Sequence, residues 1–518
     1  MDVGERLSRR VTVRRIVRFR EMNRCKSRLK AGRELTSSRM KVIDKCTANQ
    51  TLLGLMAVVV LVLTALWLDR SPVNNIGEAN VQVAALCIAA LVGVLCCGRP
   101  GSARQIYGLA FLAFHIGLLV AVFFTGVDAI PETINSGWMY TPVLNQVIIQ
   151  VAIGATGLIL GMLIPYRSLK PVASVFKDDL TTRRTLARSL RTEKLRERHS
   201  YRVGLLIYCA GLIFIVAQLF AGGFQFTEGY GAYRDAVEGN GLLGYGFLLV
   251  ALGAGLSASS RDSRIVPWVL VGIVLALFLP TGARSAALFP AAVVVSIRSR
   301  HERFRLVPLV GGVFGTLGLI SIIQRSRLEG FSGLSGNLDM NPIAALAEMG
   351  STVVTVYAAN FFVGSGRDYW YGESIFVVPI RQIEKLFGVP VLNAELDFRF
   401  FSSEIVSVFG PVGGSPVAEG VRNGGTIGVF IVMFLTGLAL AWVDSKHSTF
   451  IGLAIRISLL YALLVAVRNA LAPVIILCAA GVIAAVTATY AVRLVSAHAP
   501  HSKLEVPQAA GGHRDTEA

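Results

Sequence analysis

Long unbroken apolar segments recur along this chain, and they restrict its fold more than any other feature. A helix needs about 20 apolar residues to cross the hydrocarbon core of a bilayer. The sequence therefore predicts an all-α, polytopic transmembrane helix bundle of about 12 helices. The predicted helices are 51–68, 81–98, 105–126, 143–164, 203–221, 241–258, 265–280, 285–298, 306–323, 426–443, 449–466 and 470–493.

Charge content agrees with a membrane protein. The chain is 53% hydrophobic and 16% charged, whereas soluble domains carry about 25% charged residues. The net charge of +18 resides mostly in the amino-terminal segment and in segments between apolar runs. Basic residues at such places face anionic lipid on the cytoplasmic side. We therefore expect membrane lipid, and no nucleic acid, as their partner.

The distribution of Lys and Arg also predicts the topology. Residues 1–50 carry 15 Lys and Arg against 5 Asp and Glu. Alternate loops are rich and poor in Lys and Arg along the chain, and rich loops stay inside. We predict a basic cytoplasmic tail over 1–50, a transmembrane domain over 51–495 and a disordered cytoplasmic tail over 496–518. Both termini are then cytoplasmic.

This topology places one large external loop, 324–425, between the ninth and tenth helices. Its apolar pieces, 342–362 and 375–387, are too interrupted to span. We expect them to be amphipathic helices on the bilayer or re-entrant segments packed against the bundle. The loop has no histidine, so carboxylates must carry any proton transfer there. We find no nucleotide-binding loop and no metal-binding motif, and we expect no cofactor and no metal.

Several arginines are predicted at the outer ends of helices, where basic residues are disfavoured. Arg284 lies in a Thr-Gly-Ala-Arg-Ser turn, and Arg325 and Arg327 follow the ninth helix. Guanidinium groups bind phosphate oxygens bidentately, so these residues would suit a diphosphate at the membrane surface. Alternatively, they anchor helix ends or form ion pairs with Glu329 and Asp339.

Aromatic and charged residues gather at two points in the external loops. Tyr233 lies in the loop 222–241, and Arg367 and Trp370 lie in an Arg-Asp-Tyr-Trp-Tyr-Gly-Glu segment. Aromatic faces beside carboxylates suit carbohydrate binding. An aromatic belt that anchors the protein at the membrane interface is the competing interpretation.

The external loop ends in a glycine-rich segment that leads into the tenth helix. Ser415, Glu419 and Asn423 are spaced four residues apart, so a helical turn would place them on one face beside Arg422. A carboxylate at this position would suit a general base that acts on a hydroxyl group. A helix cap with a local ion pair is the alternative.

With these features the chain resembles the bacterial O-antigen or oligosaccharide repeat-unit polymerases, the Wzy-type integral membrane glycosyltransferases. The resemblance rests on the helix number with one late external loop, on the turn at 281–285, and on the segments 371–379 and 414–425. It covers nearly the whole chain beyond Thr51. The chain departs from the expected pattern at 420–421, where Gly and Val replace bulkier or aromatic residues.

The resemblance implies a polymerase of undecaprenyl-diphosphate-linked oligosaccharide repeat units. It would act at the outer face of the bacterial inner membrane, in surface polysaccharide biosynthesis. The implied partners are the lipid-linked oligosaccharide substrate, membrane lipid, a chain-length regulator and a flippase. Two alternatives remain open at this point. An O-antigen ligase-like transferase is expected to have a loop histidine, and a polysaccharide flippase or transporter is expected to have charges near mid-membrane on several helices.

On this interpretation the catalytic residues are Glu419, Arg284 and Arg325. Glu419 is the general base, with Glu404 and Asp397 in reserve. The diphosphate-binding arginines are Arg284, Arg325 and Arg327. The remaining substrate-contacting or orienting residues are Arg422, Ser415, Asn423, Tyr233, Arg367 and Trp370.

Overall fold

The computed structural model describes residues 48–498 with short gaps. The gaps are 74, 128–136, 165–178, 225–232, 234–241, 262, 280, 303, 306–310, 313–314, 322–340, 390, 392–396, 410–412 and 446–448. The backbone alone is described over 179–196 and 495–498. Nearly all of both predicted tails lies outside the described residues.

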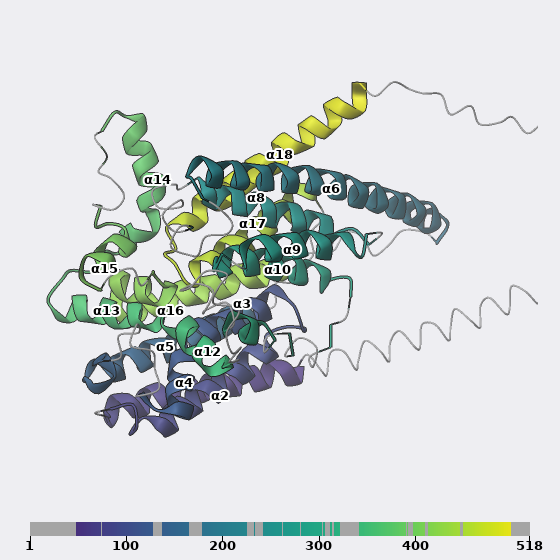
Figure 1. The fold of residues 1–518 in the computed structure, drawn as a ribbon. Coiled ribbons are helices and arrows are strands. Elements are labelled where there is room, and N and C mark those ends of the chain that lie inside the picture. Colours follow the sequence, from purple (N-terminus) through teal and green to yellow (C-terminus); the bar gives the residue numbers. More distant parts are fainter. Residues whose placement is uncertain are drawn as a thin grey trace, which may run out of the picture.

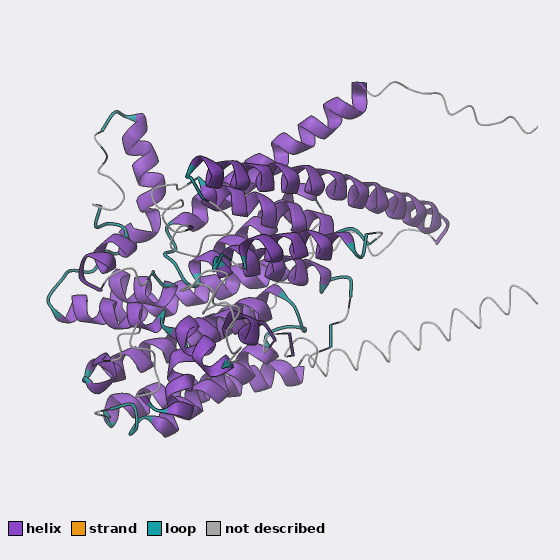
Figure 2. Ribbon diagram, in the orientation of Figure 1, coloured by secondary structure: helices purple, strands orange, loops and turns teal. Residues whose placement is uncertain are grey.

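The described part of the chain is built from helices joined by loops, without strands (Figure 2). The first helix is Ala48–Arg70, and 315–321 is also helical. The others are α2 (Asn80–Cys96), α3 (Ala103–His115), α4 (Gly117–Thr125), the 3₁₀ helix η2 (Gly137–Tyr140), α5 (Val143–Leu163), α6 (Asp179–Ala221), α8 (Leu243–Ala258), α9 (Val266–Phe278), α10 (Arg284–Arg298), α12 (Pro342–Gly350), α13 (Val353–Gly364), α14 (Glu373–Leu386), α15 (Phe401–Phe409), α16 (Pro416–Asp444), α17 (Phe450–Ala466) and α18 (Pro473–His498).

The predicted all-α polytopic bundle is confirmed. Among the described residues, six helices are long and apolar enough to cross a membrane, or seven if α3 and α4, bent by 53°, form one span. Eleven of the twelve predicted runs coincide with helices, several of them shorter than a full span. Half of the other run, 306–323, lies outside the described residues, and its described parts, 311–312 and 315–321, are helical.

The helices α5 and α16 pack with their backbones close together at the centre of the bundle. A Cβ atom added at Gly161 would lie 2.2 Å from the carbonyl oxygen of Phe434, and one added at Gly437 would lie 2.3 Å from that of Leu158. Only glycine permits this distance, and small residues are typical of helix contacts in membranes. In Figure 1, α16 lies between the group α2–α5 and the group α6–α10, α17 and α18, and it contacts α3, α5 and α17.

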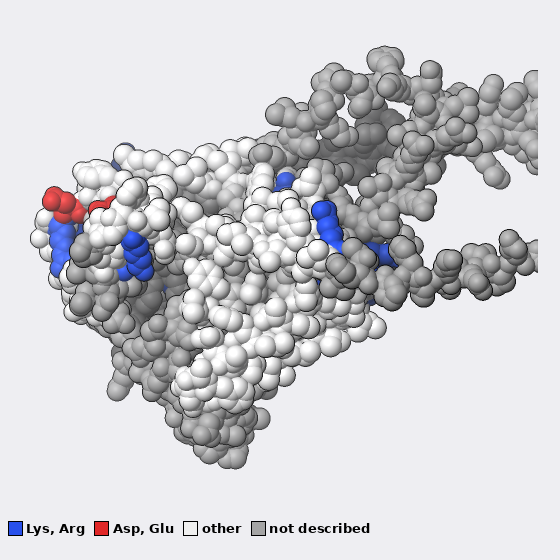
Figure 3. All heavy atoms as spheres, turned by 90° about the horizontal axis from the view of Figure 1, so that it is seen from above, with Lys and Arg blue, Asp and Glu red and all other residues white. Residues whose placement is uncertain are grey.

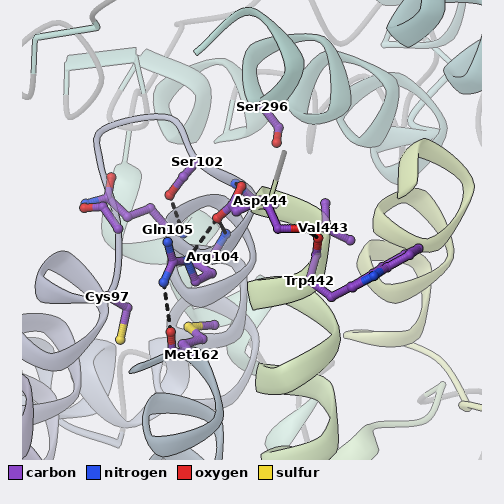
Figure 4. A network of polar contacts seen from close by, with 12 residues as sticks. Cys97, Ser102, Arg104, Gln105, Met162, Ser296, Trp442, Val443 and Asp444 are labelled. Carbon is purple, nitrogen blue, oxygen red and sulfur yellow. Dashed lines mark hydrogen bonds and ion pairs between the residues drawn. The ribbon is translucent and has the colours of Figure 1, made fainter. Parts of the chain in front are cut away.

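Polar contacts fasten the end of α16 (Figure 4). Asp444 accepts hydrogen bonds from the backbone N–H of Ala103 at 2.9 Å and from Arg104 Nε at 3.0 Å. Arg104 Nη1 also donates to the carbonyl oxygen of Met162, at the end of α5. The carboxylate thus accepts from the first two N–H groups of α3, which have no partner within the helix, next to the cap that Ser102 provides. This network joins the ends of α16 and α5 to the start of α3.

The prediction that 342–362 is too interrupted to span is wrong. The helices α12 and α13 together, Pro342–Gly364, form 23 residues that are long and apolar enough to cross a membrane. The break between them is short, and its hydroxyl groups bond back to the helix backbone, as Ser351 Oγ does to the carbonyl oxygen of Glu348 at 2.7 Å. Polar residues therefore interrupt the apolar pattern without ending the helical segment. The pair packs against α4, α5 and α16.

The helix α14 lies at one end of the bundle and runs across the direction of α5 and α16 (Figure 1). It packs against α16 and α18 and leaves Phe376, Ile383 and Leu386 exposed. Figure 3 shows charged side chains at both ends of the displayed face and uncharged side chains between them. Acidic residues appear only at the end that carries α14. Contact of α14 with the bilayer stays a prediction.

Candidate active site

The helix α16 is broken just after the residues singled out in the sequence. Gly424 and Gly425 have non-helical backbone angles, and Gly425 has φ 59° and ψ −143°. A Cβ atom added at Gly428 would lie 2.3 Å from the carbonyl oxygen of Gly420. In a straight helix these residues would be about 12 Å apart. The segment 416–423 is therefore a short helix that packs back against the main part of α16.

Glu419 lies on this short helix and is fully buried. Its Oε2 accepts a hydrogen bond from the backbone N–H of Leu471, in the turn between α17 and α18. Its Oε1 has no well-aligned hydrogen bond among the described residues, although the Ser374 hydroxyl lies close to the carboxyl group. Burying an acceptor without a partner costs free energy, so a site that keeps Oε1 open suits a group that must receive a proton. The α17–α18 turn covers this carboxyl group in the structure.

Asn423 and Ser415 fix the two ends of the short helix. Asn423 Nδ2 donates to Ser374 Oγ and to the carbonyl oxygen of Glu419, both at 2.7 Å. Its Oδ1 accepts from the backbone N–H of Gly372 at 2.7 Å. Ser415 caps the helix by accepting from the N–H of Ala418 at 3.0 Å. Both side chains therefore hold Glu419 in place through protein contacts.

Arg422, Arg367, Trp370 and Glu404 form what we call the Glu404 cluster. Arg422 Nε and Nη2 each donate to Glu404 at 2.9 Å, and Arg367 Nη1 donates to the same carboxylate at 2.8 Å. The Arg422 guanidinium lies 4.4 Å from the Trp370 ring centroid, a cation–π distance. Glu404 is thus a buried counter-ion shared by two arginines, which argues against its reserve role as a base.

Asp397, the other reserve base, is also paired. It accepts hydrogen bonds from Arg399 and Arg381, and Arg399 also pairs with Glu384 on α14. The hydrogen bonds from Arg399 are the largest cause that lowers the pKa of Asp397 to about 2. A carboxyl group with so low a pKa is a poor proton acceptor near neutral pH. This cluster holds α14 to the segment that precedes α15.

Arg284 lies at the first position of α10 and is only 7% exposed. Its Nη1 donates to Glu348 Oε2 on α12 at 2.8 Å, whereas its Nε and Nη2 have no partner among the described residues. The residue before it, Ala283, supplies no side-chain cap, so the partial positive charge of the helix N-terminus is not offset there. We call Arg284, Glu348 and this helix end the Arg284 site. It combines two unused guanidinium donors with a field that favours anions.

The two groups of residues do not meet at one point. Glu348 of the Arg284 site and Phe362, over which Arg367 and Arg422 lie, belong to the same α12–α13 segment. At 1.5 Å per residue they are separated by roughly 20 Å along the helix axis. Arg284 therefore lies at a distance from the Glu404 cluster.

The other predicted site residues are Tyr233, Arg325 and Arg327. Tyr233 is buried, and its ring meets that of Phe224 edge to face at 5.8 Å. Its ring is therefore used in packing. Arg325 and Arg327 lie outside the described residues.

Taken together, the fold and these sites define a class: a polytopic helical membrane protein with buried arginine–carboxylate pairs, some of them beside a broken helix. The comparisons with known proteins name the family. The family model for O-antigen polysaccharide polymerase Wzy matches residues 51–495, and the chain belongs to this family. No curated protein and no solved structure matches the chain.

Family membership makes the protein a glycosyltransferase-like polymerase of oligosaccharide repeat units for surface polysaccharide. It acts in a membrane on a lipid-linked oligosaccharide. The match favours the polymerase over the ligase-like and transporter alternatives.

Sequence reasoning missed Glu348, Ser374 and Leu471. Glu348 had a usable signal, because it is a lone acidic residue in an apolar segment, and such a residue needs a partner. The Leu471 contact is made by a backbone N–H, which leaves no signature in residue types.

Proposed function

We propose that this polymerase joins undecaprenyl-diphosphate-linked repeat units at the outer face of the bacterial inner membrane. Glu419 serves as general base, and Arg284, which lies apart from it, binds the diphosphate of the incoming unit, whose bond to its sugar stays intact. The observation that carries the proposal is the Arg284 site, where a buried guanidinium keeps Nε and Nη2 unused beside an uncapped helix N-terminus. Glu348 balances the charge of Arg284, but leaving two buried N–H donors without an acceptor costs free energy unless a ligand supplies one.

The charge pattern supports the assignment to the outer face. On the face shown in Figure 3, acidic and basic side chains mix at the end that carries α14, and the coloured side chains at the other end are basic. That other end also holds acidic residues, which pair with arginines there, as Glu302 does with Arg298. Basic ends face the cytoplasm. The Glu404 cluster and α14 then lie outside, and both termini lie inside. A chain-length regulator and a flippase are proposed partners on chemical grounds, because polymer length and substrate delivery need control beyond the transfer step.

The proposed reaction is a glycosyl transfer. The hydroxyl oxygen of the terminal sugar on the incoming unit attacks the anomeric carbon of the growing chain. The bond from that carbon to the diphosphate oxygen breaks, and its electron pair leaves with undecaprenyl diphosphate. The hydroxyl proton passes to Glu419 Oε1. Because Glu419 is fully buried, the α17–α18 turn must move for the hydroxyl to arrive.

Arg284→Ala, Arg284→Lys and Glu419→Gln variants test this proposal in cells that make the polymeric glycan. We expect Arg284→Ala and Glu419→Gln to leave single repeat units in place of a ladder, because a diphosphate contact or the base is lost. Arg284→Lys should shorten the chains, since Lys keeps the charge but not the bidentate fork. Gel analysis of surface glycan, normalised to inserted protein, measures the effect. Wild-type ladders from properly inserted Arg284→Ala and Glu419→Gln variants would refute the assignments.

A further inference from the structure

We infer that Glu348 is a positioning residue, which holds Arg284 so that its Nε and Nη2 groups face the phosphate. This inference rests on the proposed phosphate-binding function of Arg284. Nothing in the family assignment bears on Glu348, and its role follows from the geometry of one ion pair.

The contact uses one side of the guanidinium group. Arg284 Nη1 donates to Glu348 Oε2 at 2.8 Å, and Nε and Nη2 form the opposite edge, which has no partner among the described residues. A planar guanidinium binds phosphate through two parallel N–H groups. With Nη1 engaged by Glu348, the Nε–Nη2 edge is the one left for a bidentate contact. The carboxylate thus neutralises the arginine without covering the donors that a phosphate would use.

The carboxylate is held on a firmly packed helix. A Cβ atom added at Gly350 would lie 1.9 Å from the backbone nitrogen of Leu118, so α12 sits directly against the start of α4. Asn341 caps α12 by accepting from two backbone N–H groups. Glu348 itself has a side chain that is 19% exposed. A fixed carboxylate can orient a long, flexible arginine side chain, which would otherwise lose rotamer freedom only when ligand binds.

A matched control lies at the other end of α10. Arg298 Nη2 donates to Glu302 at 2.7 Å, so the two ion pairs have nearly the same length and the same residue types. Arg298, however, stands at the C-terminal end of the helix, where the dipole favours cations rather than anions. Glu302→Gln therefore removes a comparable charge without touching the Arg284 site.

The test measures the affinity of the full-length protein in lipid nanodiscs for undecaprenyl diphosphate. Glu348→Ala should weaken binding by about tenfold or more, because Arg284 loses the carboxylate that anchors its guanidinium group. Glu348→Gln should stay within about threefold of wild type, since an amide oxygen accepts the same hydrogen bond. Glu348→Asp, which keeps the charge but is too short to reach, should weaken binding more than Glu348→Gln. Glu302→Gln should bind as wild type does.

Two results would overturn the inference. Equal or tighter binding by Glu348→Ala would make Glu348 a competitor of the ligand. Wild-type binding by Glu348→Asp with lost binding by Glu348→Gln would make its charge, and not its position, the important property. Failure of the underlying function looks different, because Arg284→Ala would then bind undecaprenyl diphosphate as tightly as wild type does.

Discussion

Arg422 was predicted to bind substrate, but its guanidinium group forms hydrogen bonds with other residues of the protein. All three of its guanidinium nitrogens donate to the protein, two to Glu404 and one to the carbonyl oxygen of Asp368. Its backbone carbonyl also accepts from the N–H of Trp370 at 2.9 Å. Arg422 therefore joins the short helix 416–423 to the segments around Trp370 and α15, and its contribution is to stability.

Arg422→Ala should lower the free energy of unfolding by about 3–5 kcal/mol, because it leaves Glu404 buried with one partner fewer. Arg367→Ala is the control. Its side chain is 47% exposed, and Glu404 keeps both hydrogen bonds from Arg422 when Arg367 is removed, so this loss should cost only about 0–1 kcal/mol. Thermal unfolding of the detergent-purified variants measures both. A wild-type unfolding temperature for Arg422→Ala, combined with loss of the glycan ladder, would instead make Arg422 a substrate contact.

At the same scale, the sequence identifies residue types better than partners. The four-residue spacing correctly predicts that Glu419 and Asn423 meet, but the contact is made by the Glu419 backbone. Glu404 and Arg422 are 18 residues apart, and Arg284 and Glu348 are 64 apart. Partners at these separations depend on tertiary packing, which no local pattern encodes.

At the scale of elements, the break in α16 is what places Glu419 inside the bundle. Gly425→Ala should destabilise the protein by about 1–3 kcal/mol, because φ 59° with ψ −143° is a conformation for glycine. The new Cβ atom would also lie 3.0 Å from Tyr369 Oη. The neighbouring Gly424→Ala is the control, since Gly424 has φ 174° and open space for a Cβ atom. Thermal unfolding compares the two, and equal effects would contradict this account of the break.

The elements themselves were largely predictable. Apolar length identifies a helix because a span must satisfy its backbone within itself, and α5, α17 and α18 lie within a few residues of the runs that predict them. The break at 424–425 and the α12–α13 segment were not predictable. In the first case, Gly-rich sequence permits a turn without specifying its direction. In the second, the hydroxyl groups of Ser351 and Thr355 donate to carbonyl oxygens of their own helical segment. From the sequence alone, such residues look the same as polar residues that end a helix.

At the scale of the whole molecule, α16 links the two sides of the bundle and has differently built ends. Asp444 ties one end to α3 and, through Arg104, to α5. The other end carries the break, Glu419 and the contact with the α17–α18 turn. One end of α16 is therefore held by the hydrogen bonds of Asp444 and Arg104, and the other end carries the candidate base Glu419. The composition of the chain predicts a bundle, but the position of α16 within it depends on which glycines meet.

The most direct measurement of the central claim is reconstituted polymerisation. The purified protein in nanodiscs receives undecaprenyl-diphosphate-linked repeat units and no nucleotide sugar. The wild-type protein is predicted to form a ladder and to release one undecaprenyl diphosphate for each bond made. Folded Arg284→Ala protein is predicted to leave single units. A wild-type ladder from that variant would contradict the claim that Arg284 binds the lipid-borne diphosphate.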